Sequence, residues 1–124
     1  MPVVLKIDAR RRVVYSTFYG KLTDDELLGH RSAIASDPDF NGEFSEIVDF
    51  SAVSELTISE AALASMASRQ SLFSESVLHI VVAPADVAFQ LANQFKTFAR
   101  DTRRNLMVVR TRAEAYQLLG IGPE

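Results

Sequence analysis

Polar side chains that could bind a ligand stand directly after three apolar runs of this sequence. Asp49 and Ser51 follow the first run, Asp86 follows the second and Arg110 follows the third. Open α/β sheets bind ligands beyond the carboxyl ends of their strands, next to helix N-termini that favour anions. We therefore expect these four residues to form one ligand site. The structural alternative is that Asp86 caps a helix and Asp49 braces its own loop.

Arg31 is a fifth candidate, because it falls within the apolar stripe of an expected helix over residues 24–36. A buried guanidinium without a partner would be very costly. Arg31 must extend to the surface, pair with a carboxylate or face an opening, and the sequence leaves these three outcomes open.

Catalytic motifs are absent from the sequence. It contains no G-x-S-x-G, G-x-x-x-x-G-K, G-x-G-x-x-G or H-E-x-x-H pattern and no cysteine. Its two histidines, His30 and His79, are isolated from any partner motif. We interpret His79 as a core residue and His30 as a residue at the edge of a helix stripe. With no nucleophile paired with a base, we expect a protein that is not an enzyme and that needs no metal or cofactor.

A candidate interface lies on the long helix expected over residues 86–102. Phe89 falls outside the apolar arc of that helix, among Lys96 and Arg100. An aromatic side chain in such a place can anchor a partner protein or a second copy of the chain. A solvated helix face with one exposed aromatic is the alternative.

Composition limits the possible partners. The chain has 124 residues, 48% of them hydrophobic, and a net charge of −3. This length suits one domain over residues 1–124, and the charge argues against nucleic acid as a partner. The negative charge is concentrated in residues 21–86, whereas both flanking segments are basic. No apolar stretch approaches the length of a membrane span, so we expect a soluble cytoplasmic protein without membrane insertion.

Alternating and continuous apolar patterns predict the order ββαβαβαβα. The expected strands cover residues 3–8, 13–19, 46–50, 77–83 and 106–109, with Gly20 ending the second strand. The expected helices cover residues 24–36, 59–70, 86–102 and 112–119, and capping boxes begin at Thr23 and Thr111. Strands that alternate with helices indicate a mostly parallel sheet, and the short first connection makes the first strand an antiparallel edge.

Four segments carry a resemblance to a known family: LTDDELL at residues 22–28, DPDF at 37–40, IVDFSAV at 47–53 and VVAPADVAF at 81–89. In this order they resemble the STAS/SEC14-type family with the SpoIIAA-like fold, most closely its small, mostly uncharacterised bacterial branch. The resemblance covers nearly the whole chain. It implies a mostly parallel five-stranded sheet with an antiparallel edge strand and four helices.

Anti-sigma-factor antagonists of this family carry a phosphorylatable serine in an Asp-Ser-Ser-Gly turn. Alignment on residues 49–53 places that turn on residues 57–60, where Ile58 occupies the phosphoacceptor position. The resemblance therefore implies that the phosphorylation switch is lost. Thr57 and Ser59 are the remaining hydroxyls that could be modified, and Ser59 is first of all a helix cap.

Two functions remain open. The first is a non-enzymatic regulatory or protein-interaction module that forms a homodimer or binds another regulatory protein. The second is a binding protein for a small apolar or anionic ligand at the strand ends, as the resemblance to lipid-binding SEC14-like proteins implies. A chain of 124 residues has little spare volume for a whole lipid, so this second function requires a smaller ligand or a pocket shared between subunits.

Overall fold

The computed structural model describes residues 3–123 and contains the nine elements expected from the sequence, in the expected order. They are β1 (Val3–Asp8), β2 (Val13–Thr23), α1 (Asp24–Ser36), β3 (Ser45–Thr57), α2 (Glu60–Ser68), β4 (His79–Val82), α3 (Asp86–Phe98), β5 (Leu106–Val109) and α4 (Arg112–Leu119). Within these residues, no helix is long and apolar enough to cross a membrane.

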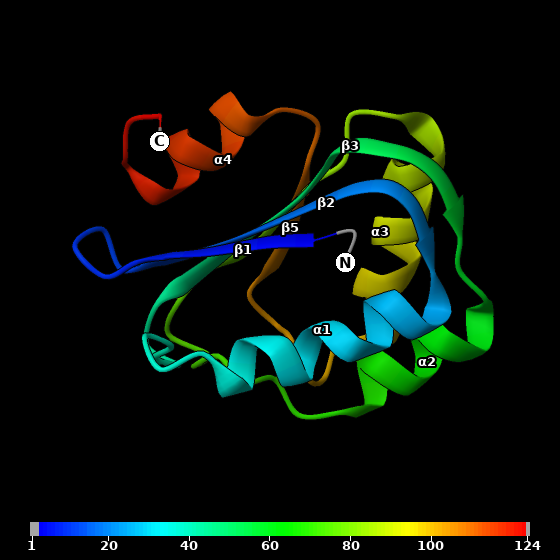
Figure 1. Ribbon diagram of the computed structural model, residues 1–124, viewed down its shortest axis with the longest axis horizontal. Coiled ribbons are helices and arrows are strands. Elements are labelled where there is room, and N and C mark those ends of the chain that lie inside the picture. Colours follow the sequence, from blue (N-terminus) through cyan, green and yellow to red (C-terminus); the bar gives the residue numbers. More distant parts are fainter. Residues whose placement is uncertain (1–2, 124) are drawn as a thin grey trace.

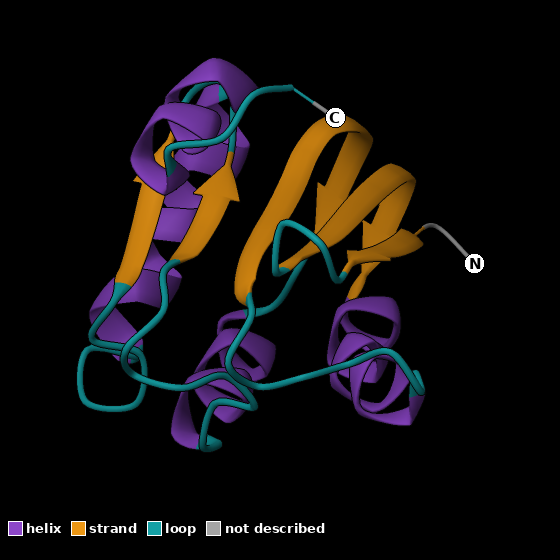
Figure 2. Ribbon diagram, turned by 90° about the vertical axis from the view of Figure 1, so that its left-hand side faces the viewer, coloured by secondary structure: helices purple, strands orange, loops and turns teal. Residues whose placement is uncertain are grey.

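The strands form one mixed sheet in the order β1-β2-β3-β4-β5. β1 pairs antiparallel with β2, and the other three pairings are parallel. The α/β class, the element order and the antiparallel edge are thus confirmed. Figure 1 shows α4 on the opposite side of the strands from α1 and α2, and in Figure 2 helices lie both above and below the strands.

The second and third strands are longer than expected. Gly20 does not end β2, which continues to Thr23 beside an extended β3 that ends at Thr57. Gly20 has a φ of 69°, and the register between the two strands shifts on both sides of it. A glycine accepts this left-handed conformation within a bulge without the steric cost of a Cβ atom. The sequence analysis interpreted Gly20 as the end of a strand, whereas it lies in a bulge within β2.

Helix ends follow the expected chemistry at most positions. The Glu26 carboxylate accepts a hydrogen bond from the Thr23 backbone N–H at 3.1 Å, which forms the expected capping box of α1. Gly120, with a φ of 67°, ends α4. Two predictions for α3 were wrong. It ends at Phe98 rather than near residue 102, and Ala85 rather than Asp86 occupies its N-cap position.

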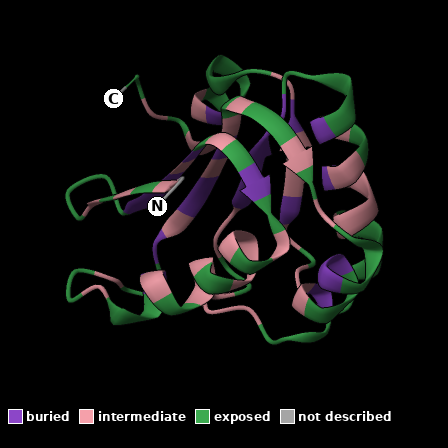
Figure 3. Ribbon diagram, turned by 45° about the vertical axis from the view of Figure 1, so that its right-hand side comes forward, coloured by how far each residue is buried: buried purple, intermediate pink, exposed green. Residues whose placement is uncertain are grey.

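The two faces of the sheet carry separate apolar clusters. One cluster includes Tyr15, Ile47 and Ile80 and packs against α4. On the other face, buried residues of the strands pack against α1 and α3. Glu46 precedes Ile47 in β3, so its side chain points to this second face. Figure 3 shows buried residues concentrated in the strands. The face covered by α1, α2 and α3 therefore contains a charged residue among apolar ones.

The loop between α2 and β4 is fastened to the loop before β3. The Ser74 backbone N–H donates to the Gly42 carbonyl oxygen at 2.7 Å. A Cβ atom at Gly42 would lie 2.7 Å from the Leu72 carbonyl oxygen. Since that oxygen belongs to the backbone, it cannot rotate away, and only glycine allows this close approach.

We expect Gly42→Ala to lower the free energy of unfolding by about 1–3 kcal/mol, because the two loops must separate to admit the methyl group. Gly29→Ala is the matched control, since a Cβ atom there meets nothing within 4 Å. Gly29 lies within α1, so its replacement by alanine should stabilise the protein by about 0.5–1 kcal/mol. Urea unfolding of the three proteins measures both changes. Equal stability of the two variants would contradict the proposed loop contact.

Candidate functional site

A cavity of about 160 Å³ lies between the sheet and the helices α1, α2 and α3. Most of its lining is apolar and comes from both the strands and the helices, including Phe18, Val48, Phe50, Leu63, Leu91 and Phe95. An apolar cavity of about 150 Å³ is sufficient to bind benzene. The cavity can therefore accommodate a small apolar group.

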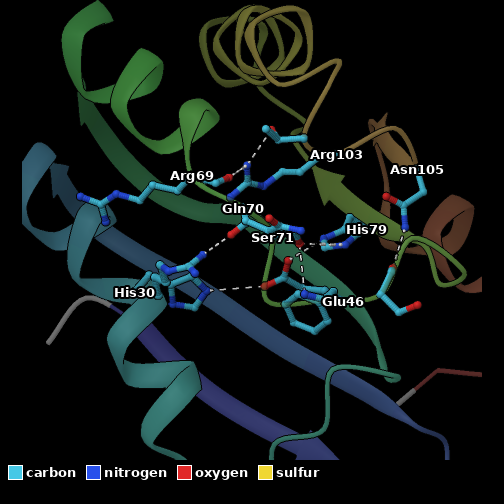
Figure 4. A network of polar contacts seen from close by, with 12 residues as sticks. His30, Glu46, Arg69, Gln70, Ser71, His79, Arg103 and Asn105 are labelled. Atoms are coloured by element: carbon cyan, nitrogen blue, oxygen red, sulfur yellow. Dashed lines mark hydrogen bonds and ion pairs between the residues drawn. The ribbon is translucent and has the colours of Figure 1, made fainter.

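A buried carboxylate and both histidines of the chain form the polar end of this cavity. Glu46 begins its strand beside His79, its partner in the parallel pairing of β3 and β4. Glu46 Oε1 lies 3.4 Å from His79 Nδ1, and Glu46 Oε2 lies 3.8 Å from His30 Nε2. The side chains of Glu46, His79 and His30 are only 11%, 4% and 12% exposed, respectively. Figure 4 shows the three side chains converging between α1 and the two strands.

The pKa of Glu46 is set by two opposing effects. Burial raises it, but the nearby imidazoles of His30 and His79 outweigh burial and lower it from 4.5 to about 2. Glu46 is therefore ionised at neutral pH, although it lies within the protein. Its negative charge holds both imidazoles toward the cavity.

Ser71 completes this polar end from the loop between α2 and β4. Its Oγ atom lies 3.4 Å from His79 Nε2 and accepts a hydrogen bond from the Phe73 backbone N–H at 3.1 Å. The Phe73 ring packs edge-on against the His79 ring, with 4.8 Å between ring centroids. The His79 ring is thus held from three sides, by Glu46, Ser71 and Phe73.

Two arginines fasten the same loop at the end of α2. Arg31 Nη1 donates to the Gln70 carbonyl oxygen at 2.5 Å. Arg103 Nη1 donates to the Arg69 carbonyl oxygen at 3.1 Å (Figure 4). Arg31 therefore faces an opening and braces backbone, one of the outcomes left open by the sequence. Burial lowers the pKa of Arg103, while the charge of Glu46 raises it and that of Arg31 lowers it.

The polar end of the cavity has an excess of positive charge. Arg31, Arg69 and Arg103 all line the cavity, against the single carboxylate of Glu46. Arg69 is exposed, so this end reaches the protein surface. An anion or a developing negative charge would be stabilised here. Metal binding has less support, because the part of the chain that the structure describes contains no group of three ligands able to hold a metal ion.

The expected site at the carboxyl ends of the strands is divided between separate contacts. Asp49 is buried on the face covered by α4, where its carboxylate pairs with Arg112 Nε. The same carboxylate accepts hydrogen bonds from the Ser51 backbone N–H at 2.8 Å and from Ser51 Oγ at 2.5 Å. Asp49 thus braces its own chain segment, as the structural alternative proposed. Arg31 lies on the opposite face of the sheet, beside the cavity.

Asp86 and Arg110 form the other contact at these strand ends. Arg110 Nη1 donates to Asp86 Oδ1 at 2.7 Å and to the Pro84 carbonyl oxygen at 3.1 Å. The Arg110 guanidinium lies 3.7 Å from the centre of the Phe89 ring. Phe89 is half-buried against the core under α3, so it is not the exposed aromatic that the helical arc predicted. Packing against the core and the contact with Arg110 hold Phe89 on the covered side of the helix.

The remaining candidates lie on the surface. Lys96 and Arg100 are exposed along a shallow hollow at the end of α3. Thr57 and Ser59 are also exposed, but the Ser59 hydroxyl is occupied. It donates to the Asp24 carboxylate at 2.7 Å and accepts from the Ala62 backbone N–H at 3.1 Å, as expected for a helix cap.

Sequence reasoning missed the convergence of His30, Glu46, Ser71 and His79. One signal was present, because Glu46 occupies the same strand face as Val48 and Phe50. A charge on a covered face requires partners, and His30, His79 and Arg31 were all candidates for this role. No spacing in the sequence relates residues 30, 46, 71 and 79, since loops and helices separate them.

Comparison with known proteins adds no assignment to this geometry, since no family model matches the chain and a search of curated proteins finds no match. The mixed five-stranded sheet agrees with the fold implied by the sequence resemblance at the level of class, order and strand direction.

We expect Glu46→Gln to destabilise the protein at pH 7 by up to about 3 kcal/mol, the free energy equivalent to its lowered pKa. A carboxyl group whose pKa is lowered by folding stabilises the native state above its unfolded value and loses this effect as the pH falls. The stability difference between wild type and variant should therefore shrink between about pH 4.5 and pH 2.

Urea unfolding of both proteins across this pH range measures the difference. Glu75→Gln is the control, because Glu75 is exposed in the loop before β4. A stability difference for Glu46→Gln that does not change with pH would show that the carboxylate charge is not the stabilising element.

Proposed function

We propose that the protein binds a small molecule that joins a short apolar group to an anionic or carbonyl group. The cavity between the sheet and α1, α2 and α3 is the site, and its size limits the apolar group to about that of benzene or a short acyl chain. This location differs from the one expected from the sequence, because the polar end of the cavity lies where β3 and β4 begin rather than where they end.

The observation that carries the proposal is the state of His30. Its side chain is 12% exposed and lines the cavity, yet neither ring nitrogen has a hydrogen-bond partner among residues 3–123. Buried polar atoms are usually satisfied, and those that are not often await a ligand or water. Glu46 Oε2, which forms an ion pair with His30, lies 3.8 Å from Nε2. This separation is too long for a hydrogen bond, so a polar group of a ligand could still bond to a ring nitrogen.

The resemblance to the STAS/SEC14-type family supports the same reading. SEC14-like relatives hold a lipid in an apolar cavity, and we place this chain beside them as a binder of a much smaller molecule. The three arginines at the polar end favour an anionic group over a neutral one. Benzoate and butyrate combine these features and are suitable probes.

Benzoate should raise the melting temperature in a saturable manner, since a ligand at about ten times its Kd adds about 1.4 kcal/mol to the free energy of unfolding. Benzyl alcohol should have a smaller effect, because it lacks the charge. Leu91→Trp should abolish the benzoate effect by filling the cavity, since Leu91 is part of its lining. Leu118→Trp is the control, because Leu118 is 40% exposed on α4.

Chemical shifts of the His30 and Phe18 rings, recorded during the same titration, locate the bound molecule. The rings lie 4.9 Å apart, so a ligand in the cavity should shift both. Equal responses of the Leu91→Trp and Leu118→Trp variants, or a titration without saturation, would contradict the proposal.

The protein-interaction module is the second candidate, and two exposed apolar residues on α3 favour it. Val87 is 67% exposed and Phe98 is 39% exposed. They are separated by about three helical turns, so both face the same side of the helix. A separate hollow, which contains Lys96 and Arg100, adds positive charge to another side of the helix. A second copy of the chain, with its acidic central segment, is the partner we consider.

Arg100→Glu should weaken self-association, because the reversed charge would repel that acidic segment. Sedimentation velocity over a range of concentrations measures the change. Arg10→Glu is the control with the same change of charge, placed in the turn between β1 and β2. A wild-type protein that remains monomeric throughout would remove the support for this candidate.

A further inference from the structure

Three side chains at the polar end of the cavity are arranged in the order used for nucleophilic catalysis. Ser71 Oγ lies 3.4 Å from His79 Nε2, and His79 Nδ1 lies 3.4 Å from Glu46 Oε1. A hydroxyl, an imidazole and a carboxylate in this order form the serine–histidine–acid arrangement, which is recognised by geometry rather than by sequence position. Figure 4 shows Ser71 and His79 facing one another beside Glu46.

The arrangement also favours one tautomer of His79. Glu46 is ionised, so its carboxylate favours a proton on the adjacent Nδ1 atom. Nε2 is then left with a lone pair that faces the Ser71 hydroxyl. The imidazole can accept the hydroxyl proton without first changing its tautomer. His30, on the other carboxylate oxygen, helps to fix the orientation of Glu46.

We infer that Ser71 is the nucleophile of an acyl-transfer centre that takes esters of small carboxylic acids, with His79 as its general base and Glu46 as the residue that positions His79. The inference rests on the proposed function, because the cavity would hold the acyl group beside Ser71. All three residues line the cavity, so a bound ester can reach the hydroxyl.

The reaction proceeds in two balanced steps. Ser71 Oγ forms a bond to the ester carbonyl carbon while its proton moves to His79 Nε2. The bond between that carbon and the alcohol oxygen then breaks, and the alcohol leaves with the proton from Nε2. In the second step, water attacks the acyl-serine and gives a proton to Nε2, and the carboxylic acid leaves as the proton returns to Ser71 Oγ.

Donors for the negative oxygen of the intermediate are available at the same place. The Phe73 backbone N–H donates to Ser71 Oγ at 3.1 Å, and a shift of this bond to the neighbouring oxygen on the attacked carbon would stabilise the intermediate. The charges of Arg31 and Arg103 add a positive potential at this end of the cavity. The arginines also hold the carbonyl groups directly before Ser71, which positions the loop.

A fluorophosphonate and p-nitrophenyl butyrate test the inference on the intact chain. Mass spectrometry should find one phosphonyl adduct on Ser71. Ser71→Ala should lower the hydrolysis of p-nitrophenyl butyrate by at least about 100-fold, while His79 remains in place. A rate that survives in Ser71→Ala would mean that the imidazole reacts alone, and this result would overturn the inference. Ser74→Ala is the control, because Ser74 lies in the same loop with its hydroxyl bonded to Ser76.

A second variant covers the case in which Ser71→Ala does not fold, since Ser71 Oγ also bonds the Phe73 backbone. Ser71→Cys places a thiol beside His79, and iodoacetamide should alkylate it at least about 10-fold faster than it alkylates Ser74→Cys. Equal alkylation rates would overturn the inference. Saturable benzoate binding without an adduct on Ser71 would remove the acyl-transfer activity and leave the proposed binding function in place.

Discussion

The carboxylate of Glu46 is a negative charge removed from water at the start of β3, and its surroundings are organised to compensate for it. A buried charge is tolerated when partners replace the lost hydration. His79 supplies one partner from the adjacent strand and His30 supplies the other from α1. His30, Glu46 and His79 all line the cavity between α1 and the sheet, so the compensated charge lies at its polar end.

The same constraint extends to the loop before β4. The loop that brings Ser71 to the far side of the His79 ring is tied to α1 through Arg31 and to the segment after α3 through Arg103. Gly42 allows the loop to approach the segment before β3. Carboxylate, imidazole, hydroxyl and guanidinium groups thus depend on one another, and each limits the conformations available to the next. Such networks stabilise a structure only when nearly every member has a partner.

The polar groups on the two faces of the sheet have different surroundings. On the face covered by α4, Asp49 and Arg112 form a contact that braces the end of the sheet. On the other face, polar groups open into an apolar cavity, where electrostatic interactions are stronger than in water. For this reason we propose the cavity, rather than the strand ends, as the place where a ligand or substrate binds. Phe89 belongs to the packing of this second face, with Arg110 over its ring.

Local patterns in the sequence by themselves determined the order of elements, the capping of α1 and α4 and the antiparallel edge strand, because apolar periodicity and capping depend on neighbouring residues. The path of the chain through Gly20 was decided by pairing with β3, which local propensity does not describe. Only the tertiary structure brought His30, Ser71 and His79 to Glu46, since the distances between them depend on how helices pack on the sheet. The sequence indeed contains no catalytic motif. Contacts between residues far apart in the chain form only when the protein folds, and they leave no fixed spacing in the sequence.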